Sequence, residues 1–381
     1  MRLLTAVEAT LDTFVATAQG ESPGSDPGPL VLAALAYDSE AAMPAHVLDT
    51  WLDALDADAE AGTIAFGPTC PMSGLAAAEP VVPRLGRLNR QLWKDVAEIW
   101  PRDRWRTRDV SWDDYDLISG PSGMLLNLAA SGPPEPPLID LCTEQLLALC
   151  AREDLDAFRL GAGNGGELNH WNEGRINTSL AHGVAGVALA LKAAVELGSP
   201  DDRLRGALAR VSDWLVSQSY VDGRGVRTWA PGGLDGAEPP AVQRRQAWCY
   251  GTPGIAWALW ESGRVLGRRD LEAFALEAMA SFCAAFDPGF HLDAEPVARL
   301  GFCHGAAGTL AVLDCFATHA RLEPAADLAR EIEALLSSQL ERIAQLAAED
   351  TSLLTGAPGM LSVLLTRAGA PRRWLLPLGL R

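Results

Sequence analysis

Long apolar runs are missing from this sequence. None of its 381 residues belongs to an uninterrupted stretch of about 18 apolar side chains, the length that a transmembrane helix requires. The first residues, Met1–Glu8, include an acid and lack the long apolar core of a secretory signal peptide. We therefore expect neither a membrane span nor a signal peptide.

Positive charge is also scarce. Lysine and arginine total 31 against 49 aspartates and glutamates, which gives a net charge of −18. Such an acidic chain would be repelled by nucleic acid and by an anionic membrane surface, so neither is expected as a partner. The hydrophobic content of 48% allows a sizeable core, and the length fits one large domain or two ordinary ones.

The cysteines do not form a disulfide framework. They number seven and lie far apart, unlike the dense, even set of a small secreted domain. A reducing cytoplasm is therefore the expected compartment. Five of the cysteines are expected to be ordinary buried thiols, namely Cys70, Cys142, Cys150, Cys283 and Cys315.

What the sequence does contain is a repeat. A Gly-x-x-Gly turn followed by an apolar run appears five times, and successive first glycines lie 63, 68, 54 and 51 residues apart. Stretches such as 201–218, 269–286 and 324–347 separate the copies and place apolar residues at the spacing of one buried helix face. A weaker copy is found at 72–77. The five turns are Gly120–Gly123, Gly183–Gly186, Gly251–Gly254, Gly305–Gly308 and Gly356–Gly359.

Each repeat predicts an apolar helix paired with an amphipathic helix, so the expected fold class is all-α. Stacked pairs form either an open solenoid or a closed ring. In a ring, the apolar helices form the inner layer and the glycine turns line one mouth. A single Gly-x-x-Gly would indicate only close helix packing, but five copies favour a shared site. The mouth would collect Asp116, His182, Cys249, Cys303 and His304.

Cys249, Cys303 and His304 directly precede two of the glycine turns. Two thiolates and one imidazole are soft ligands that suit zinc, and three protein ligands leave a fourth position open to water or substrate. An open position indicates catalysis, whereas a structural zinc has four protein ligands. A site closed by another side chain, or a set of free buried thiols, is the alternative interpretation.

Four segments resemble the motifs of the LanC-type lanthionine synthetase cyclases. They are Tyr115–Gly120, Leu180–Gly186, Trp248–Gly254 and Cys303–Gly305. The resemblance covers residues 112–366 and is much vaguer over 1–110. It implies an α/α toroid of about seven inner and seven outer helices. It also implies a single domain over 1–381, in which 1–110 are less regular or carry a small insertion.

The resemblance further implies a zinc-dependent lanthipeptide cyclase. Such an enzyme adds cysteine thiolates of a dehydrated precursor peptide to dehydroalanine or dehydrobutyrine, and so forms lanthionine and methyllanthionine thioether rings. Cys249, Cys303 and His304 would hold one zinc ion, and the substrate thiolate would take the open position. The expected partners are the precursor, a separate dehydratase and an exporter. The protein would be cytoplasmic, or peripheral to a membrane-associated synthetase complex.

Four further residues are candidates for the chemistry. His182 precedes its glycine turn as His304 does, and an imidazole exchanges protons near neutrality, as an acid or a base for this addition must. Asp116 would orient a histidine or polarise the site, or would simply form a turn. Arg245 matches the family's arginine and would stabilise an enolate or pair with Asp116, with Arg244 as a competing candidate. Tyr250 would donate a hydrogen bond or merely pack.

The same residues fit other functions. A LanC-like protein would instead add glutathione or another thiol to dehydroamino acids in proteins. A non-catalytic, zinc-containing scaffold would bind a peptide and dock a dehydratase or exporter. Prenyltransferases also activate thiolates with zinc inside helical toroids, but they use one Asp, one Cys and one His, and the pair of cysteines disfavours that reading.

Overall fold

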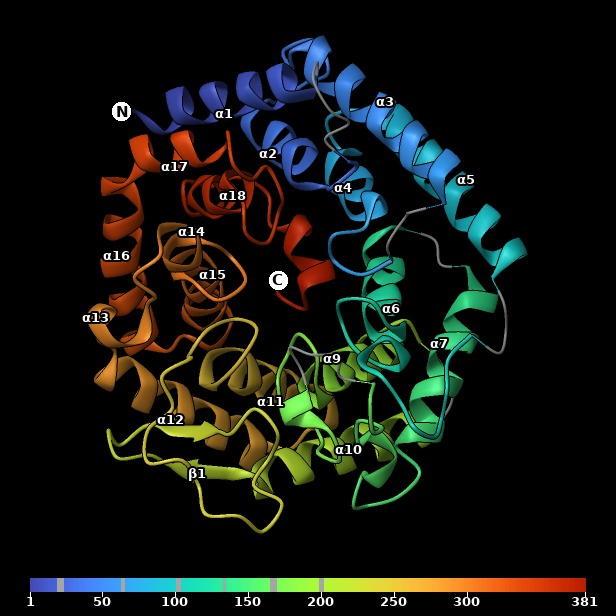
Figure 1. The fold of residues 1–381 in the computed structure, drawn as a ribbon, viewed down its shortest axis with the longest axis vertical. Coiled ribbons are helices and arrows are strands. Elements are labelled where there is room, and N and C mark those ends of the chain that lie inside the picture. Colours follow the sequence, from blue (N-terminus) through green and yellow to red (C-terminus); the bar gives the residue numbers. More distant parts are fainter. Residues whose placement is uncertain (19–23, 63–65, 101–103, 133–134, 165–169, 199–201) are drawn as a thin grey trace.

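The computed structural model of the chain is a closed double ring of helices (Figure 1). It describes residues 1–381 except 19–23, 63–65, 101–103, 133–134, 165–169 and 199–201. In the described part of the chain seven helices form the inner layer: α2 (Gly28–Ala36), α4 (Pro71–Ala78), α6 (Pro121–Ala130), α9 (Val184–Glu196), α11 (Thr252–Leu266), α15 (Ala306–Cys315) and α18 (Ala357–Arg367). Seven more form the outer layer: α1 (Leu3–Ala18), α3 (Ala45–Ala61), α5 (Pro83–Ile99), α7 (Pro136–Leu149), α10 (Asp202–Ser217), α12 (Arg269–Ala285) and α16 (Glu323–Ser338). The predicted α/α toroid is confirmed.

Inner and outer helices differ in how they are buried, as their sequence patterns indicate. All ten residues of α15 are buried, because its small and apolar side chains meet neighbours on every side. The outer helix α16 buries a single stripe, made of Ala325, Leu328, Ala329, Ile332 and Leu336.

One helix boundary differs from expectation. The amphipathic stretch 324–347 is not one helix: α16 ends at Ser338, and α17 (Leu340–Leu346) follows it. The break falls at Gln339, whose backbone leaves the α-helical region (φ −107°, ψ 11°). Periodicity alone did not reveal the break because apolar residues continue on both sides of it.

The first glycine of each Gly-x-x-Gly turn is the N-cap residue of an inner helix. The second glycine lies in the first turn of that helix, against the loop that leads into it. A Cβ on Gly308 would lie 1.8 Å from the carbonyl oxygen of Phe302, and one on Gly254 would lie 2.1 Å from that of Trp248. The loop can approach its helix this closely only because these positions carry no side chain.

Backbone hydrogen bonds join the loops before successive inner helices into a belt around the mouth of the ring. Its donor and acceptor pairs are Leu117 N to Ala181 O (3.0 Å), Leu180 N to Cys249 O (3.0 Å), Cys249 N to Cys303 O (3.2 Å) and Cys303 N to Leu354 O (2.8 Å). The loops that precede α6, α9, α11, α15 and α18 therefore lie side by side. Residues far apart in sequence are brought together by main-chain contacts.

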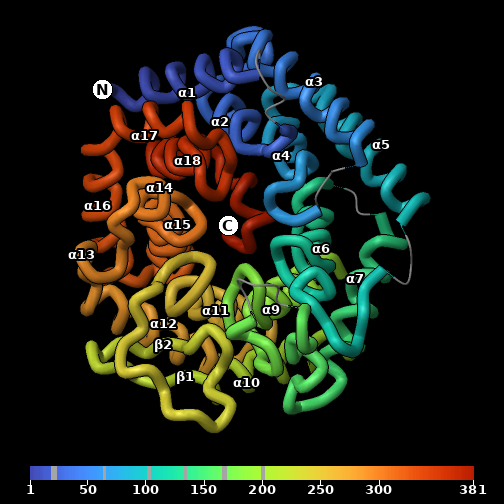
Figure 2. Tube along the Cα trace, in the orientation of Figure 1, coloured from blue at the N-terminus to red at the C-terminus, as the bar shows by residue number. Residues whose placement is uncertain are grey.

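Asp26 closes the ring between the two ends of the chain. Its Oδ1 accepts hydrogen bonds from the backbone N–H of Gly28 (2.8 Å), at the start of α2, and of Leu353 (2.7 Å), in the loop before α18. Figure 2 shows the blue N-terminal helices meeting the red C-terminal helices at this place. A single carboxyl side chain thus joins the first inner helix to the loop before the last.

The residues that follow α18 return to the centre of the ring (Figure 1). They form the turn η5 (Arg373–Leu378), which packs against α4 and α6. The indole N–H of Trp248 donates to the carbonyl oxygen of Leu378 at 3.0 Å, and that of Trp257 donates to Gly379 at 2.9 Å. One tryptophan in the loop before α11 and one in α11 itself therefore hold this segment in place.

Several short elements lie between the helices of the ring in the sequence. A hairpin of β1 (Ser219–Val221) and β2 (Arg227–Trp229) pairs Tyr220 with Thr228, and Thr252 Oγ1 donates to Arg227 O at 2.9 Å, which fixes the hairpin to the start of α11. No described helix is both long and apolar enough to span a bilayer. The remaining short elements include η1 (Trp112–Asp114), η2 (Asp156–Phe158), η3 (His170–Asn172), α13 (Pro288–His291), α14 (Pro296–Leu300) and η4 (Phe316–Ala320).

Candidate active site

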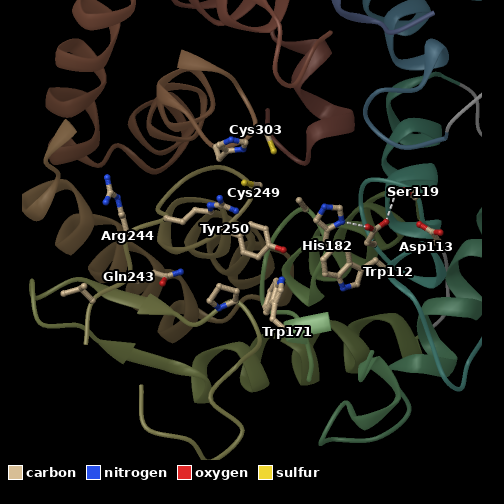
Figure 3. A pocket seen from close by; sticks show the side chains of 16 residues that line it. Trp112, Asp113, Ser119, Trp171, His182, Gln243, Arg244, Cys249, Tyr250 and Cys303 are labelled. Carbon is tan, nitrogen blue, oxygen red and sulfur yellow. Dashed lines mark hydrogen bonds and ion pairs between the residues drawn. The ribbon is translucent and has the colours of Figure 1, made fainter. Parts of the chain in front are cut away.

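A cavity of about 890 Å³ lies at the mouth of the ring, where the belt of loops runs (Figure 3). Its lining is drawn from the loops that precede α6, α9, α11 and α15, so the belt accounts for the convergence. All the residues that the sequence singled out for metal binding or catalysis line this one cavity: Asp116, His182, Arg245, Cys249, Tyr250, Cys303 and His304.

Three of these side chains form a cluster suited to a metal ion. The sulfur atoms of Cys249 and Cys303 and a ring nitrogen of His304 all lie within 4.8 Å of one another. Among the described residues no other group of three His, Cys, Asp or Glu side chains has this spacing. With zinc bonds of about 2.0–2.3 Å, tetrahedral ligand atoms are about 3.3–3.8 Å apart, so small side-chain movements would suffice. The donor set and its spacing fit zinc.

The two thiols of this cluster affect each other. Burial, followed by the neighbouring Cys303 sulfur, raises the pKa of Cys249 well above its ordinary value. A hydrogen bond from Cys249, assisted by the imidazole of His304, lowers the pKa of Cys303. The two sulfur atoms therefore interact strongly, and the nearby imidazole favours a thiolate at Cys303. A thiolate beside an imidazole is the arrangement expected of a metal-binding or reactive cysteine.

His182 is held by a buried carboxylate. Its Nδ1 lies 2.6 Å from Oδ2 of Asp116, a residue with 1% exposure. The other oxygen of Asp116, Oδ1, accepts hydrogen bonds from the backbone N–H groups of Ser119 (2.7 Å) and Gly120 (2.9 Å) at the start of α6. Burial raises the pKa of Asp116, and the hydrogen bond with His182 opposes that shift. Asp116 thus pairs with the histidine and not with an arginine, and the imidazole keeps Nε2 for the cavity.

The two adjacent arginines differ in where they act. The guanidinium of Arg244 lies 5.8 Å from the centre of the Phe290 ring, and Figure 3 shows it away from the two cysteines. Burial raises the pKa values of Cys249 and Tyr250, and the positive charge of Arg245 opposes both shifts. Arg245 is therefore the arginine whose charge reaches the Cys249 thiol.

Tyr250 has a polar role as well as a packing role. Its hydroxyl accepts a hydrogen bond from Asn177 Nδ2 at 3.2 Å. Burial raises its pKa to about 12, so the phenol keeps its proton near neutral pH. In Figure 3 the hydroxyl points across the cavity toward the side that holds His182 and Trp112. Tyr250 can therefore donate a hydrogen bond to a bound molecule.

Sequence reasoning missed three large apolar side chains of the lining, those of Trp112, Trp171 and Val242. The indole of Trp112 stacks on the His182 ring, with 4.4 Å between ring centres and 21° between planes. Trp171 and Val242 expose 43% and 42% of their surface, unusual for large apolar side chains. No repeat covers these positions. For Trp112 the only usable signal was its place four residues before Asp116.

A family model described as "Lanthionine synthetase C-like protein" matches residues 47–374. The chain belongs to this family. The match begins well before residue 112, so membership in the lanthionine synthetase C-like family extends into the region where the motif resemblance was vague.

Known proteins agree with this family assignment. The "Nisin biosynthesis protein NisC" of Lactococcus lactis subsp. lactis is 24% identical over 243 residues, which are 61% of this chain and 56% of that protein. The match thus spans little more than half of the relative's length. A solved structure titled "Nisin cyclase" superposes with a TM-score of 0.75 at 18% identity, covering 98% of this chain and 96% of that one. This likeness shows that the two proteins share one fold over nearly the whole chain.

Proposed function

We propose that the protein is a lanthipeptide cyclase, which adds cysteine thiols of a dehydrated precursor peptide to dehydroalanine or dehydrobutyrine. One observation carries the proposal. A Cys/Cys/His cluster and an imidazole held by a buried carboxylate line the same cavity. The first suits thiol activation and the second suits proton transfer, and this addition needs both. Membership in the lanthionine synthetase C-like family supports the same conclusion.

Cys249, Cys303 and His304 are the proposed zinc ligands. Bound zinc would keep a substrate thiol deprotonated at neutral pH, where a free thiol of pKa about 8.5 is mostly protonated. Two cysteine thiolates would offset the double positive charge of such an ion, so a substrate sulfur bound to it would stay electron-rich. Three histidine ligands would instead make the ion a stronger Lewis acid. The remaining residues orient the peptide and handle its proton.

The reaction joins the thiol sulfur to the β-carbon of the dehydroamino acid and leaves one proton on its α-carbon. His182, held through Nδ1 by Asp116, takes the thiol proton or delivers the proton to the α-carbon from Nε2. The guanidinium of Arg245 stabilises the negative charge that develops on the enolate oxygen. Tyr250 donates a hydrogen bond to the peptide from its protonated hydroxyl.

The substrate and partners follow from this chemistry. The precursor must arrive with dehydrated serine or threonine residues, so a dehydratase acts before this protein. An exporter is a further proposed partner, and the proposed location is the cytoplasm or the cytoplasmic face of a synthetase complex. Trp171 and Val242, which line the same cavity and are exposed, offer apolar contacts to the peptide chain.

The test uses the purified chain with zinc and a synthetic peptide that carries one cysteine and one dehydroalanine. A thioether ring leaves the mass unchanged but suppresses backbone fragmentation between the joined residues in tandem mass spectrometry. We expect ring formation with the protein well above that of a protein-free sample. Equal yields in the two samples would refute the proposal.

A second arm separates the alternative functions. A peptide with dehydroalanine but no cysteine is incubated with glutathione, with and without the protein. Protein-dependent gain of one glutathione mass, without ring formation on the first peptide, would favour intermolecular thiol addition. Peptide binding without either product would favour a scaffold.

A further inference from the structure

Trp112 covers one face of the His182 imidazole. The ring centres lie 4.4 Å apart and the planes differ by 21°, which is a stacked contact. Figure 3 shows the Trp112 and His182 rings next to each other. The Asp116 carboxylate contacts the same imidazole at Nδ1. The His182 side chain is 28% exposed, so part of the imidazole faces the cavity.

The same short turn supplies both contacts to the histidine. Trp112 opens η1, and its carbonyl oxygen accepts hydrogen bonds from the N–H groups of Tyr115 (3.0 Å) and Asp116 (2.8 Å). The carboxylate that binds Nδ1 and the indole that covers the ring face are therefore held in fixed relation to each other. The backbone of residue 112 is therefore tied to the backbone of Asp116.

This turn is itself firmly anchored. Asp114 is buried and accepts hydrogen bonds from Ser111 N (2.7 Å) and Arg106 N (2.8 Å), and Ser111 and Asp114 form a capping box around η1. Within the described residues the indole N–H of Trp112 has no acceptor. Hydrogen bonding therefore does not explain why a tryptophan stands here, whereas its flat face does.

A hydrogen bond through Nδ1 alone leaves the imidazole free to rock about the line that joins it to Asp116. The stacked indole removes that freedom because it fixes the plane of the ring. We propose that Trp112 is a positioning residue that sets the plane of His182, so that Nε2 reaches the substrate α-carbon from one side. This inference rests on the proposed cyclase function. It adds that one side chain controls both the rate of proton delivery and the face that receives the proton.

Trp112→Phe and Trp112→Ala test the inference. Phenylalanine keeps a flat ring and loses no hydrogen bond, so it should retain most of the activity. With alanine, kcat for ring formation should fall about 10- to 100-fold, the range expected when a reacting group is misplaced, with KM and zinc content little changed. The rings formed should also contain a larger share of the opposite configuration at the α-carbon, because solvent can then protonate either face. A matched control is Trp214→Ala, which removes a half-buried tryptophan from the outer helix α10.

Two readouts keep the outcomes apart. Histidine labelled at Cε1 reports the stack by NMR without substrate: the His182 resonance, identified by its loss in His182→Asn, should move downfield in Trp112→Ala as the ring current of the indole disappears. If the wild type forms rings and Trp112→Ala matches it in kcat and in configuration, the inference is wrong while the cyclase function stands. An unmoved His182 resonance would also overturn it. A wild type that forms no rings overturns the proposed function, and with it this role for Trp112.

Discussion

The backbone N–H of Cys249 donates to the carbonyl oxygen of Cys303 at 3.2 Å. Two proposed zinc ligands therefore lie on neighbouring loops that are joined by main chain. The belt continues from Cys249 O to Leu180 N at 3.0 Å, which brings in the loop that carries His182. Because main-chain contacts set the positions, replacing the functional side chains should change chemistry far more than fold.

Removing one ligand should remove the metal. Cys303→Ala takes away the cysteine whose pKa is lowered beside Cys249 and His304, and two remaining ligands hold zinc weakly. The zinc content of the purified protein, measured by atomic emission, should fall from one ion per chain to a small fraction. Cys283→Ala, at a thiol on the outer helix α12, is the control and should keep its zinc. Full zinc content in Cys303→Ala would exclude Cys303 as a ligand.

Asp116→Asn should slow catalysis without loss of zinc. The neutral amide cannot hold the His182 ring as firmly as the carboxylate that contacts Nδ1 at 2.6 Å. We expect the rate of ring formation to fall at least about tenfold, as for other carboxylates that orient a functional histidine. Asp140→Asn, the same change at an exposed site on α7, should have no effect. An unchanged rate in Asp116→Asn would leave Asp116 only a role in the turn before α6.

Alanine should have opposite effects at two glycines. In Gly308→Ala the new Cβ would lie 1.8 Å from the Phe302 carbonyl oxygen, so the loop or the helix must shift. The loss of stability should reach or exceed about 3 kcal/mol, the upper end for overpacking a core. Gly206, on the outer helix α10, has only the end of the Arg210 side chain near, at 3.5 Å, so Gly206→Ala should stabilise by about 0.5–1 kcal/mol. Urea unfolding measures both, and a Gly308→Ala protein as stable as wild type would contradict the packing argument.

Asp26 should make stability depend on pH. Although the residue keeps some exposed surface, burial of its carboxyl group raises the pKa from 3.8 to about 7. Between these values the folded chain holds a proton that the unfolded chain has released. The stabilisation is therefore fully present below the unfolded pKa and is lost as pH rises through the folded pKa, with a slope of up to about 1.4 kcal/mol per pH unit.

Asp26→Asn isolates this contribution. The amide oxygen can still accept from Gly28 and Leu353, but it does not titrate in this range. The free energy of unfolding, measured in urea from pH 4.5 to 7.5, should fall more steeply for wild type than for Asp26→Asn. Parallel curves for the two proteins would show that Asp26 ionises normally in the folded ring.

The repeat predicts the fold because each copy needs a glycine at the same place in its turn. A second glycine such as Gly308 leaves no room for a Cβ, so the pattern is forced on the sequence and can be read from it. The gathering of Cys249, Cys303 and His182 followed once the turns were placed at one mouth. The turns and the residues that precede them are defined by short sequence patterns, which can be recognised in a single sequence.

Other features depend on contacts that no local pattern encodes. The hydrogen bond from Trp248 to Leu378 joins residues 130 apart, so the return of the C-terminal segment to the centre of the ring was not foreseen. Trp112 lies in a tryptophan-rich stretch without periodicity, and its stacking on His182 depends on how η1 is anchored. The break at Gln339 was hidden because apolar spacing continues across it.

The most direct test of the account counts free thiols on a dehydrated, cysteine-containing precursor peptide. The peptide is incubated with zinc and the wild-type chain, with Cys303→Ala, or without protein, and is then alkylated and weighed by mass spectrometry. The account predicts that only the wild-type chain removes alkylatable thiols rapidly while the unalkylated mass of the peptide stays constant. Thiols that remain as reactive with the wild-type chain as without protein would contradict it.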